Sequence, residues 1–130
     1  MKKPKITMNI IKEDVGYSGI AHVGKDLIAT QGDTLDELRF NIIEATNLYG
    51  EEKRQVWTIE EIAFHYDLTS FFAFYSVINA KALSQRIGMN QSLLSQYING
   101  VKRPSAAQTK RILEGVQNIG RELAEARFVM

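Results

Sequence analysis

Two glutamines and two basic residues in the last third of the chain have the types and spacing of a surface that reads nucleic acid. Gln91 and Ser92 open a polar helical segment, and Gln96 follows one turn later. A glutamine amide offers a donor and an acceptor together, as bidentate recognition of adenine requires. Lys102 and Arg103 lie just beyond and are suited to phosphates, which would supply affinity and register rather than sequence choice.

The charge around these residues is one-sided. The whole chain has a net charge of only +1, but residues 79–111 contain six basic residues and no acid. Residues 1–57 sum to −1 and residues 58–78 to −3. The basic segment can therefore attract phosphate, while the first half has no such bias. The alternative is an amphipathic helix whose amides simply face water.

Composition bounds the class of protein. A chain of 130 residues with 45% hydrophobic and 24% charged residues suits one ordinary globular domain or two very small ones. The absence of cysteine excludes disulfides and thiolate metal sites. The most apolar run, Phe71–Ile78, is much too short to span a bilayer, and no apolar segment follows the opening MKKPK. We expect a cytoplasmic protein with no membrane partner.

The first half has the pattern of a small mixed domain. Partial alternation of apolar residues and turn signals predict strands at Ile6–Lys12, Tyr17–Val23 and Leu27–Gln31. A helix begins after Thr34, where Thr-x-x-Glu has the form of a capping box, and it closes near Gly50. Its apolar stripe consists of Leu35, Leu38, Ile42, Ala45 and Tyr49. Residues Thr58–Asp67 alternate again in their second half, with Ile62, Phe64 and Tyr66 on one side, and predict a fourth strand.

The second half has a helical period throughout. A short helix is expected over Phe71–Ser76, and Asn79 can cap a second one over Ala80–Ile87. Asn90 can cap a helix over Gln91–Asn99, and Ser105 one that runs to about Phe128. The fold class is therefore α+β, with a βββαβ domain over residues 1–67 and an all-α domain over residues 68–130.

The second half also contains a spaced motif. Its members are Leu83, Ser84, Gly88, Met89, Asn90, Leu94, Ser95, Asn99, Gly100 and Pro104. We expect Gly88 to allow a sharp bend, Met89 to fill the core between the helices and Leu94 to be buried. This spacing resembles the helix-turn-helix of the Cro/XRE repressor family from Asn79 to Ser105. Many such modules carry Glu where Ile98 stands, and an apolar residue there indicates packing against another element or a second subunit.

The resemblance implies a role for each matching residue. In that family the helix corresponding to Gln91–Asn99 enters the major groove of DNA. Gln91 and Ser92 would then meet base edges, with Gln96 one turn on. The flanking and phosphate-binding positions are Asn90, Ser95, Arg86, Lys102 and Arg103.

The first half resembles the HicB antitoxin family from Ile6 to about Tyr49. The matching residues are Gly16-Tyr17, then Thr30-Gln31-Gly32-Asp33-Thr34-Leu35, and Glu37. In that family a truncated ribonuclease H-like domain precedes a helix-turn-helix or a ribbon-helix-helix. The family's Pro-Asp-Leu-Pro-Gly-like turn is replaced here by Gly24-Lys25-Asp26-Leu27-Ile28.

This resemblance implies a type II toxin–antitoxin system. The first domain would cover the active site of a small, basic, HicA-like toxin that cleaves messenger RNA. The second would repress the operon by binding operator DNA as a homodimer or tetramer. Two-fold symmetry would separate the recognition helices by roughly 34 Å, one turn of DNA.

Two alternatives belong to other functional classes. A nuclease would need several carboxylates converging on metal ions. Turn and cap roles account for the acids of the first half, which are Asp14, Asp26, Asp33, Asp36 and Glu37. His22 and His65 have no metal-ligand spacing, so we expect no catalytic residue, no metal and no cofactor. The other alternative is a stand-alone repressor whose first domain senses a small ligand.

Overall fold

The chain folds into two compact units, Met1–Phe74 and Tyr75–Met130. The computed structural model describes residues 2–130, and over this range it contains a four-stranded mixed sheet and five α-helices. The α+β class expected from the sequence is confirmed. The division between the units falls seven residues later than the expected boundary at 67.

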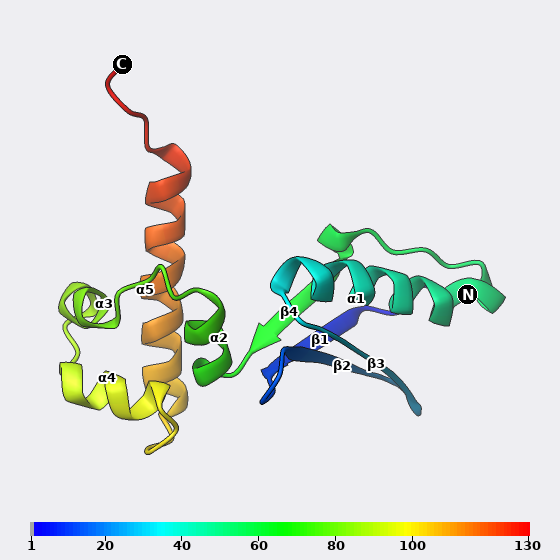
Figure 1. Cartoon of the computed structure of the whole chain (residues 1–130), viewed down its shortest axis with the longest axis horizontal. Helices are drawn as coiled ribbons and strands as arrows, with labels where there is room; N and C mark the ends of the chain where they lie inside the picture. Colours follow the sequence, from blue (N-terminus) through cyan, green and yellow to red (C-terminus); the bar gives the residue numbers. More distant parts are fainter. Residues whose placement is uncertain (1) are drawn as a thin grey trace. The chain divides into compact units, whose positions relative to one another are not determined.

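The first unit is built on a sheet with the strand order β3-β2-β1-β4 (Figure 1). Strands β1 (Ile6–Lys12), β2 (Tyr17–Val23) and β3 (Asp26–Gly32) form an antiparallel meander. Strand β4 (Ile62–Tyr66) pairs parallel to β1. The predicted bounds of the first two strands are confirmed, and the third extends by one residue at each end.

Helix α1 (Leu35–Gly50) covers one face of this sheet (Figure 1). The predicted cap is confirmed, since Thr34 Oγ1 accepts the amide N–H of Glu37 at 3.1 Å. Leu38 and Ile42 of the predicted stripe are fully buried. The core residues they join are Ile6, Met8, Ile10, Ala21, Ile28, Trp57 and Ile62.

Trp57 is the anchor of the segment between α1 and β4. Its side chain is 2% exposed, and its indole N–H donates to Pro4 O at 3.1 Å. Its backbone N–H donates to Asn47 Oδ1 at 2.7 Å, and Asn47 Nδ2 donates back to Trp57 O at 3.2 Å. These bonds tie the segment to both α1 and the start of β1.

The predicted fourth strand begins too early. The backbone N–H and hydroxyl of Thr58 donate to Glu61 Oε1 at 2.9 and 3.2 Å, which closes a turn of 3₁₀-helix over Ile59–Glu61. Strand β4 therefore starts at Ile62. The local capping interaction stabilises a turn in the first half of the segment, so only its alternating second half is extended.

Helix α2 (Leu68–Phe74) packs within the first unit, although the sequence placed it in the second domain. Ser70 is buried, and its Oγ accepts the backbone N–H of Lys12 at 2.8 Å. The ring of Phe74 stacks on that of Tyr17, with centroids 3.9 Å apart. The helix starts at Leu68 rather than Phe71 because Asp67 Oδ1 accepts the N–H of Ser70 at 2.8 Å and caps it.

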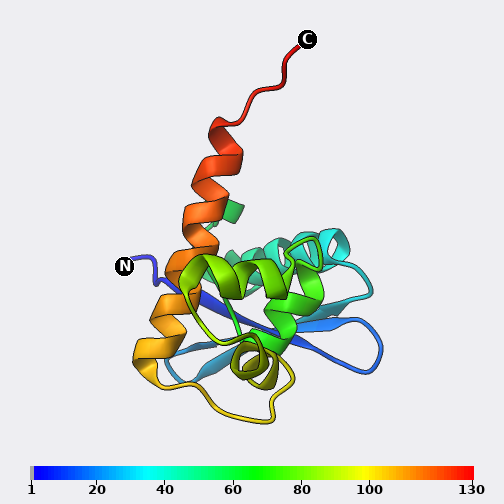
Figure 2. The same cartoon turned by 90° about the vertical axis from the view of Figure 1, so that its left-hand side faces the viewer.

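The second unit contains α3 (Ala80–Ile87), α4 (Gln91–Ile98) and α5 (Ala106–Glu125) (Figure 2). Helix α3 packs against both α4 and α5. The predicted caps Asn79 and Ser105 are confirmed, as their side chains accept the N–H groups of Ala82 and Gln108. Helix α5 ends at Glu125, three residues before the expected end. Among the described residues, no helix combines the length and hydropathy needed to cross a bilayer.

Candidate nucleic-acid interface

A tight turn between α3 and α4 sets the direction of α4. Gly88 has φ +67°, a left-handed conformation that side chains with a Cβ rarely adopt. The N–H of Met89 donates to Ser84 O at 2.9 Å, and the Met89 side chain is 6% exposed. Leu83 and Leu94 are fully buried on either side of the turn. The packing roles predicted for Gly88, Met89 and Leu94 are confirmed.

Arg111 of α5 holds the end of α3. Its Nε and Nη2 donate to Ile87 O at 3.0 and 2.7 Å, and Nη2 also donates to Gly88 O at 2.8 Å. Carbonyls at a helix end lack partners within the helix and need donors from elsewhere. From the sequence, Arg111 was only one of the bases in an acid-free segment. The sequence did not reveal this role, because the acceptor, Ile87 O, lies 24 residues away in the chain.

The outer face of α4 carries the predicted base-reading residues. Gln91, Ser92 and Ser95 are exposed, and Gln96 is half-buried. At 100° per residue these four positions span one side of the helix. Leu94 and Tyr97 are buried on the opposite side. The structure therefore brings the predicted amides together on one accessible helix face.

Two of the predicted contact residues also have structural roles. Asn90 Oδ1 accepts the N–H of Leu93 at 3.2 Å and caps α4. Ser95 Oγ accepts a hydrogen bond from Asn99 Nδ2 at 3.3 Å at the other end of the helix. Ser95 lies on the exposed face as expected and Asn90 precedes it as the cap, and both oxygens already accept hydrogen bonds within the protein.

The loop after α4 is fixed beside the helix end. The carbonyl oxygen of Gln96 accepts the N–H groups of Val101 and Lys102 at 2.9 and 3.2 Å. Gly100 has φ +75°, which lets the chain reverse there. Lys102 and Arg103 are exposed on this loop, as a phosphate-binding role requires.

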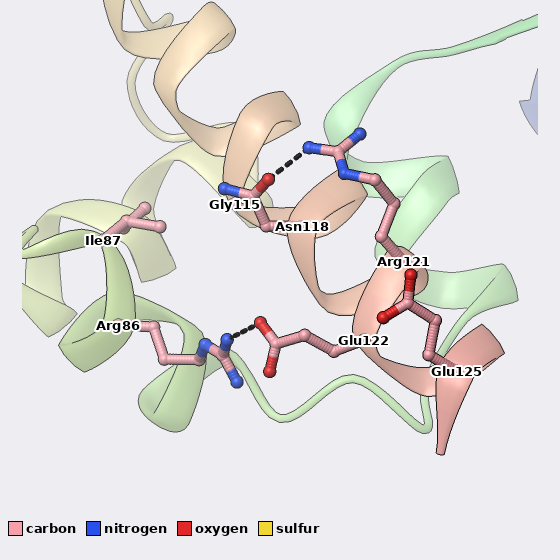
Figure 3. A pocket seen from close by; sticks show the side chains of 7 residues that line it. All are labelled: Arg86, Ile87, Gly115, Asn118, Arg121, Glu122 and Glu125. Carbon is pink, nitrogen blue, oxygen red and sulfur yellow. Dashed lines mark hydrogen bonds and ion pairs between the residues drawn. The ribbon is translucent and has the colours of Figure 1, made fainter.

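Arg86 has a different environment from the other predicted phosphate ligands. Its guanidinium forms an ion pair with Glu122 of α5 (Figure 3). The pair borders a shallow cavity of about 330 Å³. Two arginines and two glutamates lie around it, with Arg121 bonded to Asn118 (Figure 3). This balanced set gives no strong preference for an anion, and Arg86 already has an acidic partner on the surface of the unit.

The two units differ in charge. Residues 75–130 carry eight basic and three acidic side chains, a net charge of +5. Residues 1–74 carry eight basic and twelve acidic side chains, a net charge of −4. The basic excess thus belongs to the unit that carries the exposed amide face.

Two hollows in the described part of the first unit have charged linings. One, of about 350 Å³, is lined by Lys2, Lys25 and Lys53 beside Asp26 and Tyr49. The hydroxyl of Tyr49 donates to Asp26 Oδ2 at 3.1 Å, and desolvation together with this carboxylate raises the pKa of Tyr49 above its ordinary value.

The second hollow, of about 470 Å³, is lined by Val15, Gln31, Gly32, Asp33 and Glu37. Gly32 of this lining lies close to Gly16, the other glycine of the motif in the first half. A Cβ on Gly16 would be 2.5 Å from Gly32 O. Over residues 2–130, no group of three or more His, Asp or Glu side chains is placed to hold a metal ion.

Comparisons with protein-family models, curated proteins and solved structures found no significant match to this chain. The function is therefore inferred from the geometry of the two units and from the sequence motifs in residues 16–37 and 79–105.

Proposed function

We propose that the chain is a DNA-binding transcriptional repressor that also acts as the antitoxin of a HicA-like toxin. The observation that carries the proposal is the exposed amide face of α4. The turn before α4 is held by hydrogen bonds from Arg111, and the exposed basic residues Lys102 and Arg103 follow the helix. The face belongs to a unit with a net charge of +5.

In this proposal α3 and α4 act as a helix-turn-helix, and α4 lies in the major groove. Gln91, Ser92 and Gln96 contact base edges and specify sequence. Lys102 and Arg103 neutralise phosphates and set register. Because Arg86 is paired with Glu122, its contribution to phosphate binding is smaller than the sequence suggested.

The antitoxin part of the proposal concerns the first unit. Its net charge of −4 complements a basic toxin. The backbone at Gly16 and Gly32 of the HicB-like motif is in close contact, which leaves no space for a side chain on Gly16. Beside them, Asp33 and Glu37 line the hollow that we propose receives a basic side chain of the toxin.

Co-expression with the product of the adjacent gene, followed by a pull-down, tests the antitoxin part. A partner of small size and basic charge should copurify. The double variant Asp33→Lys/Glu37→Lys should release it, whereas Lys25→Glu/Lys53→Glu in the other hollow should not. If no partner copurifies with the wild-type chain, the antitoxin assignment is wrong.

The second candidate function is a repressor that senses a small anion. The hollow lined by Lys2, Lys25 and Lys53 favours it, because three lysines and one acid, Asp26, give its lining a net positive charge. It predicts that Lys25→Glu/Lys53→Glu abolishes an effector response of DNA binding while copurification finds no partner. The two candidates therefore give opposite results in the same pair of variants.

A further inference from the structure

The outer side of α1, turned away from the strands, carries two large apolar side chains that the first unit does not cover (Figure 1). Phe40 and Leu48 are 66% and 69% exposed. They are two turns apart, which is about 12 Å along the helix axis. Leu38 and Ile42 of the same helix are fully buried against the sheet. The core is therefore served by the inner side of α1, and Phe40 and Leu48 are additional to it.

Acidic side chains surround these two apolar residues. All of them are exposed, and they are Asp36, Glu37, Glu44 and Glu51. At 100° per residue, the four acids and the two apolar residues fall within about 120° around the helix axis. Arg39, the one basic residue in the sequence of α1, lies outside this arc. We call the six residues the α1 face.

The acids of the α1 face extend to an end of the helix where they are unfavourable. The C-terminal end of a helix carries partial negative charge, which favours basic side chains. The last turn of α1 contains no basic residue, and Glu51 caps the helix. Within residues 2–130, the ion pairs involve neither Glu44 nor Glu51. These carboxylates are therefore available to positive charge from outside the unit.

The charge of the α1 face selects the class of partner. Four carboxylates repel nucleic acid and anionic lipid surfaces. Two copies of the face repel each other for the same reason, so a symmetric pair of α1 helices is disfavoured. A basic protein surface with apolar side chains between its cations matches both the acids and the exposed Phe40 and Leu48.

Glu37 joins the α1 face to the hollow described above. It belongs to the first turn of α1 and also lines that hollow beside Asp33. The hollow and the α1 face thus form one continuous acidic surface. A single basic partner can contact both.

We propose that the α1 face is the main docking surface for a basic protein. Apolar side chains of that protein contact Phe40 and Leu48, and its lysines and arginines pair with Glu44 and Glu51. The apolar contacts supply most of the affinity, while the acids speed association and exclude other partners. The inference deepens the proposed function and rests on it, since the partner is the small basic toxin.

Titration of the full chain with the purified product of the adjacent gene tests the apolar contacts. Phe40→Ser and Leu48→Gln should each weaken binding by about tenfold or more, as truncation of an interface anchor does. Each substitution keeps the helix propensity nearly unchanged, so α1 should stay folded. Val56→Ser changes another exposed apolar residue of the first unit and should bind normally.

Charge inversion tests the electrostatic contribution. Glu44→Lys should weaken binding by about threefold or more at low salt, as expected for loss and reversal of an exposed ion pair. The difference should shrink at high salt, because ions screen exposed charges. Glu60→Lys changes an exposed acid outside the α1 face and is the matched control.

The outcomes separate this inference from the proposed function. If the partner binds Phe40→Ser and Leu48→Gln as tightly as the wild type, the docking surface is wrong and the antitoxin assignment is unaffected. If no partner binds the wild-type chain, both are wrong. Operator binding should be the same in Phe40→Ser and wild type. A change there would mean that the α1 face binds the chain's own basic unit, which would also overturn the proposal.

Discussion

The guanidinium of Arg111 donates two hydrogen bonds to the carbonyl oxygen of Ile87, joining α5 to the turn between α3 and α4. Through Gly88 O, the same side chain also holds the residue that reverses the chain. A basic residue in a segment suited to phosphate thus has a structural role, because it binds the carbonyl oxygens at the end of α3 and in the turn before α4.

Arg111→Ala should destabilise the chain by about 1–2 kcal/mol, because it leaves carbonyls at the end of α3 without a charged donor while water can reach the site. Chemical denaturation measures this change. Arg103→Ala removes an exposed base of the same type and serves as the matched control, with no loss of stability expected. Equal stabilities of the two variants would show that the Arg111 bonds contribute little.

Gln91→Ala and Gln96→Ala should each weaken binding to the operator by about 1–3 kcal/mol, the range for loss of a bidentate base contact. Mobility shifts with operator and scrambled duplexes provide the measurement. Binding to the toxin should be unchanged, because these side chains lie on α4. If both variants keep full preference for the operator, α4 is not the recognition helix.

Lys102→Ala should weaken binding to all sequences and reduce the slope of log affinity against log salt by about one. The cause is the loss of one released counterion when the phosphate contact disappears. A salt titration with operator and with unrelated DNA measures both slopes. Lys25→Ala, in the first unit, is the control, and an unchanged slope for Lys102→Ala would contradict a phosphate contact.

Glu61 makes stability depend on pH. The hydrogen bond from Lys3, assisted by the N–H of Thr58, lowers the pKa of Glu61 below its ordinary value of 4.5. The carboxylate thus adds stability above that pH, and this contribution is lost as the pH falls through the lowered pKa.

Glu61→Gln should therefore be less stable than wild type near neutral pH, and the difference should disappear in strong acid. Urea denaturation at several pH values tests this. Glu60→Gln, at the neighbouring exposed carboxylate, should show no such trend. A difference that persists in acid would mean that packing, not charge, explains it.

Local signals determined most of the elements. The caps at Thr34, Asn79, Asn90 and Ser105 were all predictable, because a cap joins residues three positions apart. The burial of Met89 and Leu94 followed from spacing alone in the same way. The exposed face of α4 was predictable because helical geometry relates its members directly.

The tertiary structure decided which residues far apart in the sequence form hydrogen bonds and ion pairs. The backbone N–H of Lys12 donates to Ser70 Oγ, 58 positions away, and this hydrogen bond attaches α2 to β1 of the first unit. The pairing of Arg86 with Glu122 spans 36 positions and gives an acidic partner to an arginine that the sequence presented as unpaired. Periodicity carries no information about such contacts, because they form only when separate elements pack. The sequence alone thus determined which residues α4 exposes. Packing decided which of the nearby basic side chains already interact within the protein.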